Sequence, residues 1–170
     1  MFSIIAAVSN IDGIGMGGTI PWSEPEDMRY FKRITSNSCS TDKRVRNAIV
    51  MGRNTYASLN GRVLPNRVNV CISSSITGEN IYTTLQGALD ALYADPLIGK
   101  IFIIGGGQLY SEAIVHPDCK DLYINHIDTD VACDVFFPHI DHNIYSLCTT
   151  ELLTPTITTR YYRNKQTSIV

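Results

Sequence analysis

Short apolar runs, most of them ending in small or polar residues, alternate along the chain with segments of helical spacing. Continuous apolar runs of this length are typical of strands covered on both faces of a parallel sheet. We therefore expect an α/β fold with a mostly parallel central sheet, flanking helices and an antiparallel C-terminal edge strand. The expected strands are 4–8, 48–51, 67–74, 100–104, 121–128, 145–153 and 156–163, with helices near 24–34, 52–59, 85–92 and 109–114 and a short extended segment at 134–138.

With 170 residues and 44 % hydrophobic side chains, the chain is large enough for one complete core, and we expect a single domain over 1–170. The net charge of −2 and the pI near 6.0 provide no field that would gather nucleic acid or an anionic membrane surface. We expect a monomer that binds its ligands at a local site. The N-terminal segment 2–8 lacks a basic region and is too short to cross a bilayer, so it is interpreted as a strand.

The cysteine pattern indicates neither a disulfide framework nor a metal site. The cysteines are odd in number and widely spaced, with no C-x-x-C and no histidine within zinc-ligand spacing of a cysteine pair. We expect reduced, mostly buried thiols in a cytoplasmic protein, and no metal. The cysteines are Cys39, Cys71, Cys119, Cys133 and Cys148.

A helix is predicted to begin near Glu24, just after the only tryptophan. Ser23 followed three residues later by Glu26 has the pattern of a capping box, and Pro25 is tolerated in a first turn. Trp22 stands immediately ahead of this helix, where a wall or hinge residue would stand.

The same helix carries a carboxylate on its apolar face. At about 100° per residue, Met28, Phe31 and Ile34 share one face, and Asp27 falls within it. One interpretation is that this first-turn acid offsets the helix dipole. However, a carboxylate on an inner face needs a cationic or strongly donating partner, from the protein or from a ligand. The second interpretation therefore makes Asp27 a ligand-binding group.

The glycine-rich segment after the first strand has two interpretations. Gly13, Gly15 and Gly18 satisfy G-x-G-x-x-G, the pattern of a dinucleotide-binding turn. That turn requires a helix to begin inside the glycines, whereas no amphipathic run is found here before Glu24. We therefore favour a mobile loop, formed by residues 12–22, that serves as a lid.

Residues suited to binding phosphate follow several of the predicted strands. Gly52 opens a short helix directly at a strand end, where Arg53 is either part of an anion site or an ordinary solvated residue. Ligands of open α/β sheets bind beyond the carboxyl ends of the strands, so we expect one crevice at these ends. The segments expected to share it are the glycine loop, residues 52–55, Ser73 with Ser74, and residues 105–107.

Eight segments in order resemble dihydrofolate reductase over essentially the whole chain. They are I-A-A-V with D-G-I-G and P-W, E-D-M-R-Y-F, I-V-M-G-R-N-T-Y, R-V-L-P-N-R, S-S, I-I-G-G-G-Q-L-Y, L-Y-I-N-H-I-D and D-V-F-F-P. The resemblance implies NADPH-dependent reduction of 7,8-dihydrofolate to 5,6,7,8-tetrahydrofolate, with hydride passing from nicotinamide C4 to pterin C6 and a proton to N5. It also implies a role in one-carbon and thymidylate metabolism, and binding of antifolate-type small molecules.

On the substrate side, the resemblance implies that Asp27 holds the pterin ring, because an ionised carboxylate accepts two parallel hydrogen bonds from N3–H and the 2-amino group. A water molecule, admitted by the lid that contains Trp22, would carry the proton. Arg67 would pair with the carboxylate of the glutamate tail. The residues expected at the substrate are Ile5, Ala7, Ile20, Asp27, Met28, Phe31, Leu59, Leu64, Arg67, Ile104, Tyr110 and Asn125, with Asp27, Trp22 and Asn125 as catalytic residues.

On the cofactor side, the resemblance implies that residues 105–107 contact the pyrophosphate, while Arg53 and Ser74 meet the 2′-phosphate. Gln108 stands where bacterial members often carry a further arginine. The residues expected at the cofactor are Ala7, Ile14, Gly15, Gly52, Arg53, Asn54, Thr55, Ser73, Ser74, Ile104, Gly105, Gly106, Gly107, Gln108, Leu109 and Tyr110.

Asn125 is the departure that matters most, because it stands where the family usually has a threonine bonded to the acid. Three interpretations follow. The first is an active reductase. The second is a catalytically weak member that retains nucleotide binding, and the third is another nicotinamide-dependent enzyme, such as a pyrimidine-pathway reductase. The pairing of Trp22 with Asp27, together with Arg67, favours the first over the third.

Overall fold

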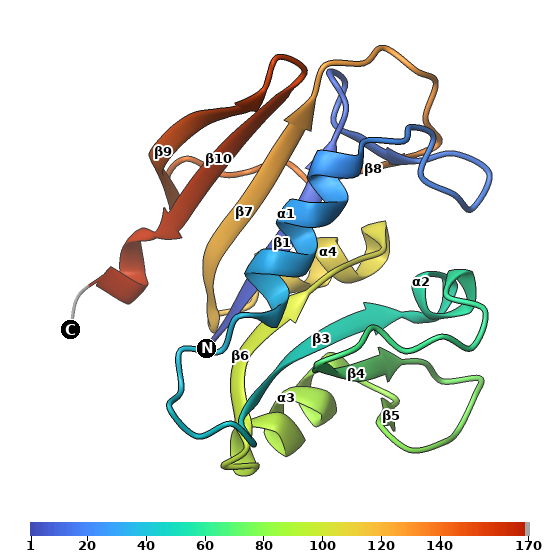
Figure 1. The fold of residues 1–170 in the computed structure, drawn as a ribbon, viewed down its shortest axis with the longest axis vertical. Helices are drawn as coiled ribbons and strands as arrows, with labels where there is room; N and C mark the ends of the chain where they lie inside the picture. The colour runs from blue at the N-terminus through green and yellow to red at the C-terminus, as the bar shows by residue number, and fades with distance from the viewer. Residues whose placement is uncertain (169–170) are drawn as a thin grey trace.

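The computed structural model describes residues 1–168. Its core is an eight-stranded sheet in the order β5-β4-β3-β6-β1-β7-β10-β9 (Figure 1). All neighbours from β5 to β7 are parallel, whereas β10 is antiparallel to both β7 and β9. The strands are β5 (Ile81–Tyr82), β4 (Arg67–Ile72), β3 (Arg46–Gly52), β6 (Ile98–Ile103), β1 (Phe2–Val8), β7 (Cys119–Ile127), β10 (Ile157–Asn164) and β9 (Tyr145–Thr154). The predicted fold class is confirmed, with the antiparallel strand β10 one place inside the edge.

Four α-helices and a 3-10 helix accompany the sheet. They are α1 (Pro25–Ser36), α2 (Arg53–Ser58), α3 (Leu85–Ala94), α4 (Gly107–Ile114) and the 3-10 helix η1 (Lys165–Ser168). The predicted cap of α3 is present, since Thr84 Oγ1 accepts a hydrogen bond from the Gly87 N–H at 3.0 Å. Among residues 1–168, none of the helices is long and apolar enough to cross a membrane.

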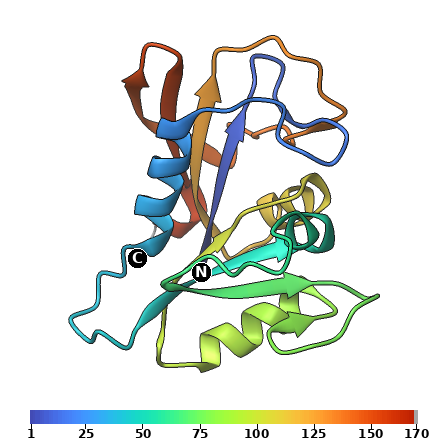
Figure 2. The same cartoon turned by 45° about the vertical axis from the view of Figure 1, so that its right-hand side comes forward.

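The two faces of the sheet bury separate apolar clusters. Along β1, Ile4 and Val8 belong to the cluster that contains the buried residues of α3 and α4. Ile5, on the alternate side, belongs to a second cluster with Tyr30 of α1. Figure 2 shows α1 beside β7 and β1, on the side away from α4. The α1 face of the sheet is therefore the one that can present Asp27.

The predicted capping box at the start of α1 is wrong in one respect. The helix begins at Pro25 with Glu24 as its N-cap, and no side chain makes a capping hydrogen bond. Proline at the first helical position has no N–H to satisfy and already has a helical φ, so the start needs no Ser23 cap. The buried residues of α1 are Tyr30 and Thr35, whereas Met28 is 58 % exposed at the rim of the face.

The glycine segment forms a short hairpin-like unit and does not form a dinucleotide-binding turn. Strand β2 (Gly13–Gly15) pairs antiparallel with β8 (Val135–Phe136), and a turn follows at Met16 and Thr19. No helix begins before Pro25, which excludes the G-x-G-x-x-G interpretation. The Gly17 N–H donates to Asp134 Oδ2 at 3.1 Å. This segment is thus attached to the chain around β8.

All five cysteines are free thiols, and two of them, Cys71 and Cys119, are buried. Cys39 and Cys148 are exposed and Cys133 is partly buried, so the expectation of mostly buried thiols holds for only part of the set. Cys133 packs directly against Gly13, where any side-chain carbon would collide with its sulfur. This contact explains why a glycine is required at the first position of β2.

The loop between α1 and β3 is closed by one buried amide. Asn47 Nδ2 donates to the Thr35 carbonyl at 3.0 Å and to the Asn37 carbonyl at 2.9 Å. Asn47 Oδ1 accepts from the Lys100 N–H at 2.9 Å. The end of α1, the start of β3 and the start of β6 are therefore fixed together by a single side chain.

Candidate active site

Asp27 and Asn125 form the polar centre of the α1 face. Asp27 lies in the first turn of α1, and Asn125 of β7 is 1 % exposed. Asn125 Nδ2 donates a hydrogen bond to Asp27 Oδ1 at 2.9 Å. Burial raises the pKa of Asp27 above its ordinary value, the Asn125 hydrogen bond opposes this rise, and the charge of Glu24 adds to it. Within the described residues this is the one side-chain hydrogen bond that the carboxyl group accepts, so it retains lone pairs for a further donor.

Asn125 is held in turn by Thr159, which we did not predict as a site residue. Thr159 of β10 lies directly opposite Asn125 in the antiparallel pair. Its Oγ1 donates to Asn125 Oδ1 at 2.7 Å, and both residues are buried. The relevant signal in the sequence is the alternation of Thr159 on its strand, which becomes informative only once the β7–β10 register is known.

Several apolar residues expected at the substrate lie near this centre. Ile5 of β1 is buried beside it, and Ala7 pairs with Asn125 across β1 and β7. Tyr110 Oη donates to the Ile5 carbonyl at 2.8 Å, and burial raises the pKa of its hydroxyl far above the ordinary value. The further predicted residues that pack into the cluster on this face are Phe31, Leu59, Leu64 and Ile104.

Two predicted substrate residues, Ile20 and Met28, and the predicted catalytic residue Trp22 are less enclosed. Ile20 and Met28 are each 58 % exposed, and Trp22 is half-buried. Ile20 and Trp22 lie in the segment 12–22 that was predicted as a lid, and Met28 lies on α1. These three residues are not among those that pack into the apolar cluster of the α1 face.

Arg67 lies at the other end of this face in a preset orientation. It is 5 % exposed, its Nε donates to the Pro65 carbonyl at 2.9 Å, and its Nη1 donates to Thr35 Oγ1 at 3.0 Å. Its guanidinium carbon lies 5.9 Å from the centre of the Phe31 ring. Burial lowers its pKa, yet an arginine stays charged under all ordinary conditions. No carboxylate lies within ion-pair distance of this cation in the described chain.

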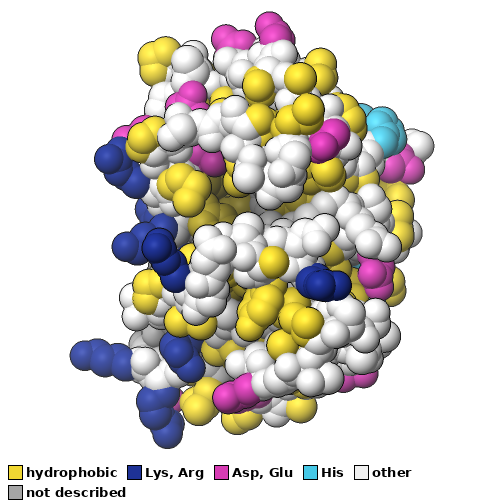
Figure 3. All heavy atoms as spheres, turned by 90° about the vertical axis from the view of Figure 1, so that its right-hand side faces the viewer, with side chains coloured by type: hydrophobic (Ala, Val, Ile, Leu, Met, Phe, Trp, Pro, Cys, Tyr) yellow, Lys and Arg dark blue, Asp and Glu magenta, His cyan; other side chains and the backbone are white. Residues whose placement is uncertain are grey.

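The glycines after β6 meet the end of β3. The Gly52 N–H donates to the Gly105 carbonyl at 2.8 Å. A side-chain carbon on Gly106 would lie 3.7 Å from Thr55 Oγ1, whereas one on Gly107 would lie 2.7 Å from Val135. Gly105 has φ +122°, a conformation that favours glycine. The space-filling view toward these strand ends shows a hollow with apolar side chains in its floor (Figure 3).

Arg53 contacts a serine that follows the predicted pair Ser73 and Ser74 in the chain. Its Nη1 donates to Ser75 Oγ at 2.8 Å, and the Ser73 and Ser75 hydroxyls lie 3.2 Å apart. Ser74 is exposed and makes no such contact. Ser75 was not predicted, because its contact with Arg53 of α2 depends on the path of the turn after β4. Arg53, Ser73 and Ser75 together form a small polar cluster beside the glycines.

The remaining predicted cofactor residues lie in three places: at the starts of α2 and α4, in β2, and in the core. Asn54 and Gln108 are exposed at the starts of α2 and α4, and Gly15 with Ile14 belongs to β2. The Leu109 side chain is buried in the core on the α3 and α4 side, so only its backbone faces the crevice end of α4. That side chain therefore packs in the core of the fold.

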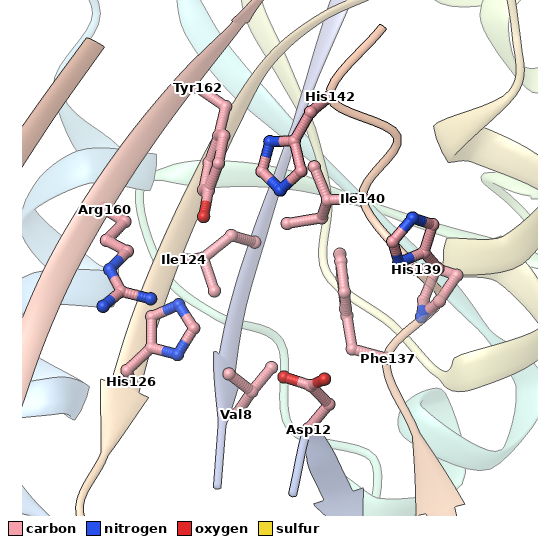
Figure 4. Close-up of a pocket in the computed structure, with 11 residues that line it drawn as sticks. Val8, Asp12, Ile124, His126, Phe137, His139, Ile140, His142, Arg160 and Tyr162 are labelled. Carbon is pink, nitrogen blue, oxygen red and sulfur yellow. The ribbon is translucent and has the colours of Figure 1, made fainter. Parts of the chain in front are cut away.

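Two cavities, of about 200 and 400 Å³, lie on the opposite face of the sheet. His126 and Arg160 line both, and Figure 4 shows them side by side with Asp12 below. They alternate along β7 and β10 with Asn125 and Thr159, so they point away from Asp27. None of the predicted site residues lines either cavity. No cluster of three or more metal-ligating side chains is found within residues 1–168.

The chain matches the family model described as "Dihydrofolate reductase" over residues 1–163. It is 34 % identical over 151 residues to the dihydrofolate reductase of Schistosoma mansoni, with 82 % of this chain and 78 % of that protein covered. It is 35 % identical over 147 residues to that of Drosophila melanogaster, covering 82 % and 80 %. Identity is 37 % over 156 residues to "Bifunctional dihydrofolate reductase-thymidylate synthase 2" of Arabidopsis thaliana, covering 85 % of this chain and 27 % of that protein.

Fold and similarity together define a single class of α/β protein with a mostly parallel central sheet. The chain belongs to the dihydrofolate reductase family. It spans between 27 % and 30 % of the length of the bifunctional plant relatives that it matches.

Proposed function

We propose that this protein reduces 7,8-dihydrofolate to 5,6,7,8-tetrahydrofolate with NADPH as the cofactor. The observation that supports this most strongly is the half-buried Asp27 carboxylate, bonded to Asn125 and flanked by apolar side chains. At the other end of the same face lies Arg67, which has no carboxylate partner within the described residues. The pterin ring of dihydrofolate matches Asp27, its apolar linker matches the apolar side chains, and its terminal carboxylate matches Arg67.

Asp27 positions the pterin. When ionised, its carboxylate accepts the bond from Asn125 and still has lone pairs for the N3–H and 2-amino group of the ring. These two parallel bonds fix the orientation of the ring in its plane. The negative charge also favours protonation of the pterin, and a water molecule entering beside the lid delivers that proton to N5.

Arg67 recognises the glutamate tail of the substrate. Two of its guanidinium nitrogens are already bonded to Pro65 and Thr35, so the cation is held in one orientation before the ligand arrives. Preorganisation of this kind lowers the entropy cost of binding. The remaining donors suit a carboxylate, which arginine binds in a bidentate manner.

The crevice beside α2 and α4 fits a dinucleotide. Backbone of Gly105–Gly106 comes close to Gly52 and Thr55 without intervening side chains, which allows phosphates to approach the chain. Arg53, with Ser73 and Ser75, provides a cation and hydroxyls for a 2′-phosphate, which favours NADPH over NADH. When bound there, the reduced nicotinamide supplies the hydride for pterin C6.

The weak-member interpretation was motivated by Asn125, and the observed contact argues against it. Asn125 makes the bond to the acid that a threonine hydroxyl would make, so the polar centre is complete. The free thiols are compatible with a reducing compartment, and we place the protein in the cytoplasm.

Spectrophotometric oxidation of NADPH tests this proposal. Consumption of NADPH that depends on dihydrofolate, together with inhibition by a 2,4-diaminopteridine, is the expected result. Oxidation that proceeds with a pyrimidine-pathway substrate and not with dihydrofolate would assign the chain to the other class. Nucleotide binding without turnover would support the weak-member interpretation.

A further inference from the structure

We propose that Thr159 is a positioning residue for the reductase reaction, acting through Asn125 on Asp27. The inference rests on the proposed function, since it takes Asp27 as the group that binds the pterin. Three side chains from three elements form an unbranched chain of hydrogen bonds. Thr159 Oγ1 donates to Asn125 Oδ1 at 2.7 Å, and Asn125 Nδ2 donates to Asp27 Oδ1 at 2.9 Å.

The need for this chain follows from the chemistry of a carboxamide. Only the NH2 end of Asn125 can donate to an ionised carboxylate, so its carbonyl end must point away from Asp27. At 1 % exposure, that carbonyl cannot be satisfied by bulk water. A buried acceptor without a donor is destabilising, and the Thr159 hydroxyl supplies the donor.

The strand register makes this contact specific to one face. Thr159 is directly opposite Asn125, whereas the preceding residue, Thr158, is opposite His126. Thr158 therefore points to the other face of the sheet, where it lines the larger cavity. The pair provides a matched control, because the same substitution at 158 and 159 changes opposite faces of one strand.

The charged and titratable groups near Asp27 are few. Glu24 acts on it from the same helix, while Tyr30 of α1 and Tyr110 of α4 also interact with its charge. In the described chain, Asn125 is the one side chain that donates a hydrogen bond to this carboxyl group. A change that displaces the Asn125 amide therefore removes the only side-chain hydrogen bond to Asp27 within the described residues, and no second side-chain donor replaces it.

Thr159→Val removes the hydroxyl while keeping a similar shape. With its carbonyl unpaired, Asn125 rotates, and the donation to Asp27 weakens while the effect of burial remains. We expect kcat/KM for dihydrofolate near neutral pH to fall about fivefold, the range of a single hydrogen bond. Thr159→Ser keeps the hydroxyl and is expected to restore kcat/KM to within about twofold. Thr158→Val is expected to leave kcat/KM unchanged.

A second measurement does not depend on turnover. A diaminopteridinium binds the ionised form of Asp27, so its affinity falls as the pH drops through the pKa of that carboxyl group. Losing the Asn125 donation raises this pKa further. The acid limb of the affinity profile, followed by quenching of Trp22 fluorescence, is therefore expected to move to higher pH in Thr159→Val and to stay in place in Thr159→Ser and Thr158→Val.

An Asn125→Thr background separates positioning from general packing. A threonine hydroxyl at 125 donates to Asp27 without an amide that must be held, so adding Thr159→Val should then have little effect on either measurement. An equal loss in both backgrounds would show that Thr159 matters only for packing and would overturn the proposal. Wild-type behaviour of Thr159→Val in both measurements would overturn it as well.

Two further variants keep the interpretation clear. If Thr159→Val does not fold, Thr159→Ala removes the same hydroxyl with a smaller side chain, and urea unfolding reports the stability of each variant. Asp27→Asn tests the proposed function separately. If this variant keeps wild-type turnover and affinity, the proposed function fails, whereas an impaired Asp27→Asn beside a normal Thr159→Val removes only the role of Thr159.

Discussion

Asp27 combines two opposing influences on a single side chain. Burial favours its neutral form, while the Asn125 amide favours the ionised form that the proposed binding of a pterin requires. The sequence indicated that this carboxylate lies on an inner face, because at helical spacing its direction around the helix axis falls between those of Phe31 and Ile34. That Asn125 donates to it could not be read from spacing, since the two residues are far apart in the chain.

Replacing this carboxylate tests its proposed role directly. Asp27→Asn carries no charge and accepts only one of the two pterin bonds, so turnover of dihydrofolate near pH 7 should fall by more than tenfold, about 1.4 kcal/mol in the barrier. Steady-state kinetics of the purified variant provide the measurement. Turnover within about threefold of wild type, about 0.7 kcal/mol, would show that the assignment is wrong.

Arg53 should discriminate between the two nicotinamide dinucleotides. Its cation faces the Ser73 and Ser75 hydroxyls, a setting that suits the phosphate found on NADPH and absent from NADH. Arg53→Ala should weaken NADPH binding by about 1.5–3 kcal/mol and leave NADH nearly unchanged. Fluorescence titration of both cofactors measures this, with Arg62→Ala, at an exposed position between α2 and β4, as the control. Equal weakening of both cofactors would place Arg53 outside the phosphate site.

At the scale of elements, helical and strand spacing predicted the main features, and register supplied what spacing could not. The buried strands and most of the helices follow from apolar patterns, and the one predicted cap that the structure contains is Thr84 of α3. The pairing of β2 with β8 joins two very short segments without a marked pattern, and it was not predicted. Thr159 and Ser75 were missed for the same reason, because each becomes part of the site through a contact between elements.

The attachment of the lid to the β8 region should affect turnover. Asp134 accepts from the Gly17 N–H, so Asp134→Ala removes one attachment of the glycine segment while the backbone bond from Asp134 N–H to the Gly15 carbonyl remains. We expect kcat/KM to fall by about two- to tenfold, the range of one hydrogen bond. Asp130→Ala is the control, because Asn10 keeps its bond to Asp128 and the effect should be smaller. A larger loss in the control would contradict a specific role for Asp134.

For the whole molecule, holding Asp27 partly buried has a cost in stability. A carboxyl group whose folded pKa is raised contributes stability below its unfolded pKa, and that contribution is lost as the pH rises through the folded value. At neutral pH the wild type therefore keeps a carboxylate where burial opposes its charge. The site and the stability of the fold make opposite demands on this residue.

Asp27→Asn should accordingly be more stable than the wild type at pH 7, even though it is less active. Thermal unfolding should show a higher Tm for the variant, where about 1 kcal/mol corresponds to a rise of about 2–4 °C in a chain of this size. The difference should disappear at a pH below the ordinary carboxyl pKa, where both side chains are neutral. A Tm advantage that persists unchanged in acid would show that charge is not its cause.

Asn47 fixes both ends of the loop between α1 and β3, so the length of this loop can change without moving the elements that it connects. Because its amide joins the end of α1 to the starts of β3 and β6, the loop over residues 38–45 leaves and re-enters the body at one fixed point. An insertion of about eight flexible residues there adds little closure entropy. It should leave kcat/KM unchanged, whereas the same insertion in the presence of Asn47→Ala should disturb Thr35 and the Arg67 bonded to it. A peptide segment, or a domain fused through it, can therefore be inserted in this loop without changing the arrangement of the candidate site.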